Sequence, residues 1–158
     1  MAEDKKILAK KAFELVRSAL DGRKWTYKTD EEKLAFNFGV SGDDLPMDVI
    51  VKIDEDRQLI RLFSKFPFDI KEDKRLDAAV AVCMANYGMV DGGFDFDLGK
   101  GSILFRCVST YRESQLSVEL VNYLISLTCA MVDKYNDRFL MLGKGMLTLE
   151  QFLEADNA

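Results

Sequence analysis

The chain has 158 residues, of which 48% are hydrophobic, and 22 basic against 27 acidic residues give it a net charge of −5. With only 2 Pro and 10 Gly, this composition fits one compact domain and excludes collagen-like, Pro-rich and disordered chains. The absence of histidine excludes a Ser-His-Asp or Cys-His nucleophile and any zinc site with a His ligand.

Residues 4–20 are predicted to form an amphipathic helix. Apolar residues recur there at spacings of one, three and four: Ile7, Leu8, Ala12, Leu15, Val16, Ala19 and Leu20. Lysines between residues 5 and 11 lie among the acidic residues Glu3, Asp4 and Glu14, so we interpret them as the solvated face of this helix. The acidic net charge also argues against a nucleic-acid partner, because phosphate binding requires a concentrated basic surface.

The next segments alternate apolar and polar residues with the period of a strand. We predict strands over residues 34–40, 47–53 and 57–65, the last ending at Pro67, which has no N–H for a sheet. Such a meander of three antiparallel strands cannot bury a face alone and requires a helix against it.

The second half of the chain predicts two more strands between helices. A helix after Glu72 carries an apolar stripe that we expect to cover the sheet, formed by Leu76, Ala79, Val80, Cys83, Met84 and Tyr87. Strands over residues 94–98 and 102–111 follow, joined by a Gly-Lys-Gly turn. A long helix then starts after the N-cap Ser117 and ends at Gly143. At about 24 residues it is roughly 35 Å long, so we expect part of it to pack against a second copy or a partner.

These elements predict an α+β fold with an antiparallel five-stranded sheet and flanking helices. The order is α-β-β-β-α-β-β-α, and a capping box at residues 148–151 adds a short C-terminal helix. We expect a single domain over residues 1–158, with the first helix at 4–20, the sheet and its helices at 25–142, and the last helix at 148–155.

No residue pattern nominates a catalytic, cofactor or metal site. Asp91, Asp95 and Asp97 do not have the spacing of a calcium loop. The segment from Gly99 to Ser102 is followed by a predicted strand, whereas a phosphate-binding loop precedes a helix. The remaining acids fall in turns and on exposed helix faces, where carboxylates stay ionised and make poor general acids. We therefore expect a protein that is not an enzyme and has no cofactor or metal.

The three cysteines are interpreted as small buried hydrophobic residues in a reducing compartment. Cys83, Cys107 and Cys129 lie more than twenty positions apart and form no C-x-x-C pair. The first residues lack the apolar segment of a secretion signal, and no apolar run approaches the about 20 residues that span a bilayer. We expect a cytoplasmic protein that is not membrane-bound.

Four segments resemble the YbjN family of candidate bacterial sensory transduction regulators, whose fold is similar to that of type III secretion chaperones. They are WTYKTDEEKLAFNF (25–38), DVIVKIDEDRQLIRLFSKFPFDI (48–70), LDAAVAVCMANYGMVDGGFDFD (76–97) and SQLSVELVNYLISLTCAMVDKYNDRFLML (114–142). These are packing and turn motifs, such as Asn86 and the turn Gly92-Gly93-Phe94, with no catalytic signature. The resemblance implies a sheet flanked by helices, a tendency to dimerise, and non-enzymatic chaperone-like or regulatory work.

The leading functional hypothesis is a homodimer that binds a protein or peptide client. An extended segment would add to an exposed sheet edge, with side chains entering grooves beside the first helix. Trp25, Tyr27, Phe36 and Phe38 are the predicted contact residues, because rigid aromatics bury much area at small entropic cost. The alternative hypothesis is a small-molecule-sensing regulator with a pocket between the sheet and the long helix.

Overall fold

The computed structural model describes residues 1–157, so residue 158 of the expected domain lies outside the described residues. The elements in chain order are α1 (Ala2–Gly22), β1 (Lys28–Asp30), β2 (Ala35–Ser41), β3 (Pro46–Asp54), β4 (Leu59–Asp69), a 3₁₀ turn (Glu72–Lys74), α2 (Arg75–Tyr87), β5 (Gly93–Asp97), β6 (Ser102–Thr110), α3 (Val118–Gly143) and α4 (Leu149–Asn157). The expected α+β class and antiparallel sheet are confirmed.

The sheet has six strands in the order β1-β2-β3-β4-β6-β5, so the predicted count of five was wrong by one. The additional strand, β1, pairs with β2 through three residues only. Three residues are too short to show an alternating pattern, so sequence periodicity could not reveal this strand.

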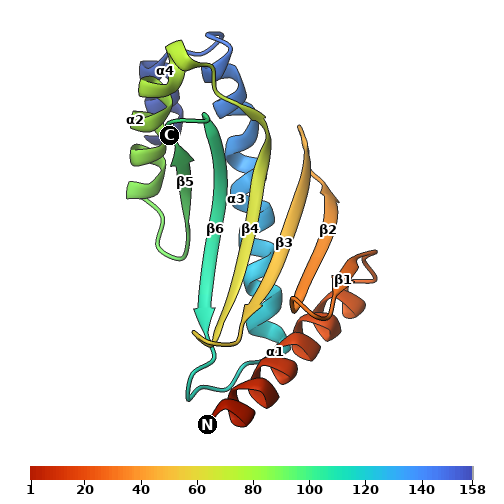
Figure 1. Ribbon diagram of the computed structural model, residues 1–158. Helices are drawn as coiled ribbons and strands as arrows, with labels where there is room; N and C mark the ends of the chain where they lie inside the picture. Colours follow the sequence, from red (N-terminus) through yellow and green to blue (C-terminus); the bar gives the residue numbers. More distant parts are fainter. Residues whose placement is uncertain (158) are drawn as a thin grey trace.

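Helices cover one face of the sheet and leave part of the other open (Figure 1). In β3 the side chains of Met47, Val49, Val51 and Ile53 are buried, whereas the alternate residues are exposed. α1 and α3 pack on the buried face, and α2 and α4 lie at the end of the sheet beside β5 (Figure 1). This arrangement leaves the outward-facing residues of the central strands in contact with solvent.

The third predicted strand also ends later than expected. β4 continues through Pro67 to Asp69, and the register of its pairing with β6 shifts between Lys65 and Asp69. A proline is tolerated at such an irregularity, because the regular ladder of hydrogen bonds is already interrupted there. Pro67 therefore marks a bend in β4, whereas the sequence had predicted its end.

The predicted starts of the last two helices are confirmed. The Ser117 side chain accepts a hydrogen bond from the backbone N–H of Leu120 at 3.0 Å. In the capping box, the Thr148 N–H donates to the Gln151 side chain, and the Gln151 N–H donates to the Thr148 hydroxyl. Each pair satisfies N–H groups that a helix start leaves without partners.

The length of α3 is used within the chain. Near its N-terminal half, the Arg23 guanidinium of the segment after α1 donates to the Asn122 side chain, the Asn122 carbonyl and the Ser126 hydroxyl. Toward the other end, α3 contacts α2 and α4. The surplus length expected to meet a second copy or partner is thus covered in large part by the chain's own helices.

A pH-dependent loss of stability is expected from Tyr111, which follows β6. Its hydroxyl donates to the Asp54 carbonyl, and burial, together with the nearby acids Asp54 and Glu55, raises the pKa of Tyr111 to about 12. Folding then favours the neutral phenol, so this stabilisation is complete below pH 10, the ordinary tyrosine pKa, and is lost as the pH rises towards 12.

Thermal melts between pH 8 and 12 test this expectation. The wild type should lose on the order of 1 kcal/mol of unfolding free energy through Tyr111 after solvent screening, and Tyr111→Phe should show a shallower decline above pH 10. Part of the decline should remain in the variant, because burial and the Asp156 carboxylate also raise the pKa of Tyr135. Identical alkaline slopes for the two proteins would contradict the assignment.

Candidate protein-binding surfaces

The structure brings the four predicted contact residues together, but two of them lie in the core. Phe36 and Phe38 are 1% and 2% exposed, whereas Trp25 and Tyr27 are half-buried. The ring of Trp25 lies 5.6 Å from that of Phe38, and the ring of Tyr27 lies 5.6 Å from that of Phe36. Of these four residues, Trp25 and Tyr27 are the two with surface that a partner could contact, and their role in binding stays a prediction.

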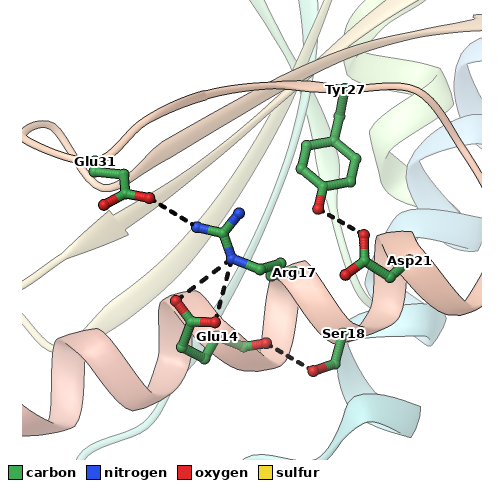
Figure 2. Close-up of polar contacts among 6 residues, drawn as sticks. All are labelled: Glu14, Arg17, Ser18, Asp21, Tyr27 and Glu31. Atoms are coloured by element: carbon green, nitrogen blue, oxygen red, sulfur yellow. Dashed lines mark hydrogen bonds and ion pairs between the residues drawn. The ribbon is translucent and has the colours of Figure 1, made fainter.

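A polar network on α1 holds Tyr27 in place (Figure 2). Its hydroxyl donates to the Asp21 carboxylate at 2.6 Å, and this hydrogen bond raises the pKa of Tyr27. Arg17 pairs with Glu14 on the same helix and with Glu31 in the turn between β1 and β2. These contacts tie the short strand β1 to α1 and fix the aromatic ring between them.

The largest departure from the sequence prediction is on α2, where the expected core stripe is the exposed one. Leu76 is 75% exposed, Val80 45%, Met84 39% and Tyr87 90%, and Cys83 is exposed with them. The buried face consists instead of the small residues Ala78, Ala81, Val82 and Ala85. We call the exposed set Leu76, Val80, Cys83, Met84 and Tyr87 the α2 stripe.

The buried face of α2 differs from the predicted one because this helix carries two apolar faces. Alanines let a helix approach its neighbours closely, and here they pack towards β5, α3 and α4. The larger residues then point away from the core. Hydrophobicity alone favoured the larger side chains as the buried set, and the smaller stripe at the same spacing was the missed signal.

α2 is fastened at its first residue to the turn between β5 and β6. The Arg75 guanidinium donates to four backbone carbonyls, those of Ile70 at 3.2 Å, Leu98 at 3.3 Å, Gly99 at 2.7 Å and Lys100 at 3.3 Å. The turn therefore directs the carbonyl oxygens of residues 98–100 at the positively charged Arg75 side chain. An anion site needs converging N–H donors, so this geometry is opposite to that of a phosphate-binding loop.

Near the other end of α2, Asn86 is joined to the outer strand β5. Its side-chain amide donates to the Phe94 carbonyl at 2.8 Å, and its side-chain oxygen accepts from the Phe94 N–H at 2.7 Å. The two bonds copy those that a neighbouring strand would exchange with Phe94. The α2 stripe is therefore presented by a helix fixed at both ends.

The acids considered for calcium binding are engaged elsewhere. Asp95 forms two hydrogen bonds with Arg106 across β5 and β6, Asp97 accepts from the Lys100 N–H, and Asp91 accepts from the Tyr123 hydroxyl. Among the described residues, no three acidic or cysteine side chains gather as a metal site would require. None of the helices described is long and apolar enough to cross a bilayer.

The cysteines occupy three different environments. Cys107 is buried, Cys129 is half-buried, and burial raises the pKa of both thiols. Cys83, by contrast, is exposed in the α2 stripe, so the expectation that all three are buried was wrong for this residue. An exposed thiol in that position is a convenient probe of whether the stripe is covered.

Comparison of the structure with solved structures identifies its fold. YbjN from E. coli, a candidate transcription regulator, matches 80% of this chain and 92% of its own with a TM-score of 0.57 and 9% identity. ExsC in its complex with ExsE matches 82% of this chain and 93% of that chain with a TM-score of 0.55 and 13% identity. The fold is shared with YbjN and ExsC. No family model matches the sequence, and no curated protein sequence matches it either.

These matches confirm the fold expected from the resemblance to YbjN and to type III secretion chaperones. At 9% and 13% identity the similarity extends to the architecture and carries no residue roles across. The function must therefore be argued from the surfaces of this chain.

Proposed function

We propose that this protein is a non-enzymatic protein-binding module, chaperone-like or regulatory, that works as a homodimer. The observation that carries the proposal is the α2 stripe, a contiguous set of large apolar side chains held in solvent by a rigid helix. ExsC, which shares the fold, was solved in complex with a second protein, ExsE, and this supports a protein-holding role for the architecture.

A second copy of the chain is the occupant that best fits the α2 stripe. The stripe is nearly symmetric about its centre, since Leu76 and Tyr87 lie at its ends and Val80 and Cys83 lie equally far inside. Two such helices packed antiparallel would therefore place apolar against apolar side chains along their length, as a two-fold interface requires. Arg75 and Asp77 are the only charged residues of α2, and charge depletion is typical of interface cores.

The double substitution Val80→Asp/Met84→Asp tests the dimer. Both side chains are exposed, so the isolated fold should tolerate the change to within about 0.5 kcal/mol. Two carboxylates in an apolar interface should weaken dimerisation by at least about 100-fold, because each must be desolvated without a partner. Sedimentation and light scattering should report a dimer for the wild type and a monomer for the variant.

The matched control is Gln115→Asp/Ala130→Asp, which adds the same charge at exposed positions outside α2. It should remain a dimer. Maleimide labelling gives a second readout, since Cys83 should react slowly in the wild type and fast in Val80→Asp/Met84→Asp. A wild type that remains a monomer up to about 100 μM, with Cys83 fully reactive, would contradict the dimer.

The alternative of a small-molecule-sensing regulator rests on a cavity between the sheet and α3. It has a volume of about 390 Å³ and lies among Phe105 of β6, Met131 and Tyr135 of α3, and the loop after α2. A metabolite that fills it should raise the melting temperature in proportion to occupancy, which a pure protein holder would not show.

A further inference from the structure

The sheet contains a seam at its centre. β3 and β4 pair from Asp54 and Leu59, next to their turn, only as far as Ile50 and Phe63. Beyond that point β3 continues to pair with β2, and β4 with β6, but no pair joins Pro46–Val49 to residues 64–69. Figure 1 shows β3 and β4 diverging from their common turn towards the opposite end. We call this opening the β3–β4 seam.

A groove occupies the seam. Its volume is about 740 Å³, within the range of ligand-binding pockets, and residues of both halves of the sheet line it. Met47 and Ile50 contribute from β3, Phe63, Phe66 and Phe68 from β4. The lining is thus mostly apolar, and the walls are two strands whose facing edges lack the backbone partners that a continuous sheet would provide.

The open end of the seam is acidic. Asp43 and Asp44 lie in the loop between β2 and β3, and the Asp43 N–H donates to Asp133 of α3 at 2.8 Å. Partial desolvation and the nearby carboxylates of Asp137, Asp133 and Asp43 raise the pKa of Asp44. Asp48 lines the groove itself, as do Lys65 and Asp69, which form an ion pair with each other at 3.3 Å. Asp43, Asp44, Asp48, Asp133 and Asp137 form no ion pair in the part of the chain that the structure describes, so their charges are not balanced. An occupant with basic residues at this end would complement them.

We propose that the β3–β4 seam accepts an extended peptide segment of a partner protein, paired by its backbone with β3 and β4 and carrying basic residues towards Asp43 and Asp44. This inference deepens the proposed protein-binding function, on which it rests, by naming where the partner chain enters. Only an extended strand supplies N–H and C=O groups to both open edges at once while placing alternate apolar side chains in the groove.

Hydrogen exchange with a defined probe tests the proposal. The probe is the eight-residue peptide acetyl-Lys-Lys-Val-Thr-Val-Thr-Val-Thr-amide, added at about millimolar concentration. In the free protein, amides in residues 46–49 and 64–68 that face the seam should exchange faster than those of residues 51–53. The peptide should slow exchange in both seam segments and leave α2 unchanged.

Two altered peptides and two protein variants serve as controls. A peptide with alternate backbone nitrogens methylated keeps the side chains but loses strand pairing, so it should bind about tenfold more weakly or worse. Replacing its lysines by glutamates should have a similar effect. Asp43→Asn/Asp44→Asn should weaken binding of the lysine peptide, whereas Glu150→Gln/Glu154→Gln, which removes the same charge from α4, should not.

Gly39→Leu is the variant that fills the seam. A Cβ at Gly39 would meet only the Asp48 carboxylate and the Met47 carbonyl, at 3.8 and 3.9 Å, so the added side chain enters the groove without backbone strain. It should abolish protection of the seam by the peptide and leave the dimer intact.

The outcomes separate the seam from the proposed function. If the peptide protects β1 and Trp25 instead, the proposal that it binds in the seam is wrong, whereas the proposed protein-binding function still holds. Slow exchange of the seam amides in the free protein would contradict the open edges of β3 and β4. A lysine peptide that gives no protection would contradict peptide binding in the seam. If the wild type is in addition monomeric, the proposed function fails with it.

Discussion

Replacing Phe139 by alanine should lower the free energy of unfolding by about 3–5 kcal/mol, the largest effect we expect from a core side chain. Phe139 is completely buried on α3. Its ring centroid lies 5.7 Å from that of Phe66, 5.5 Å from that of Phe94 and 4.9 Å from that of Phe152. The residue thus joins β4, β5 and α4 to the long helix, and its truncation leaves a cavity that all three elements border.

Urea unfolding followed by fluorescence of Trp25, the one tryptophan, measures this loss. Phe139→Leu is the matched control, since it keeps most of the volume and should cost about 1–2 kcal/mol. If Phe139→Ala costs less than about 1 kcal/mol, the packing of Phe139 against the three neighbouring phenylalanines does not stabilise the fold as expected.

Gly101→Ala should cost about 2–4 kcal/mol, because the turn between β5 and β6 has no room for a side chain. Gly101 has a φ of +79°, and an added Cβ would lie 2.1 Å from the Ile70 carbonyl oxygen. That oxygen also accepts from Arg75, and the Ile70 N–H donates to the Gly101 carbonyl at 2.7 Å. The substitution must therefore displace the start of α2 as well as strain the turn.

Gly99→Ala in the same turn is the comparison. Its Cβ would meet only the flexible Asp97 carboxylate, at 3.3 Å, and its φ is not positive. It should cost less than about 1 kcal/mol. Equal thermal stabilities of the two variants would show that the turn relaxes around an added methyl group.

Much of the fold was predictable because local signals agreed with the tertiary structure. Alternating residues identified β2, β3, β5 and β6, and the caps at Ser117 and Thr148 identified the last two helix starts. The misses have specific causes. β1 is too short to show a period, Pro67 sits at a register shift that sequence does not reveal, and α2 offers two apolar stripes of which packing selects the smaller.

The candidate binding surfaces were harder to predict from the sequence. Phe36 and Phe38 were predicted as contacts because they are aromatic, yet strand alternation points both towards α1 and the core. The seam is defined by where the pairing of two strands stops, and each strand has an ordinary pattern of its own. Such a feature depends on the divergence of two strands in space, which no single-segment pattern encodes.

The side-chain amide of Asn86 protects part of the outer edge of the sheet. Because it occupies the outward N–H and C=O groups of Phe94, a strand from a neighbouring molecule cannot pair with β5 at that residue. An unprotected edge at β5, next to the exposed apolar α2 stripe, would favour aggregation. This side chain thus works against edge-to-edge pairing of copies through β5.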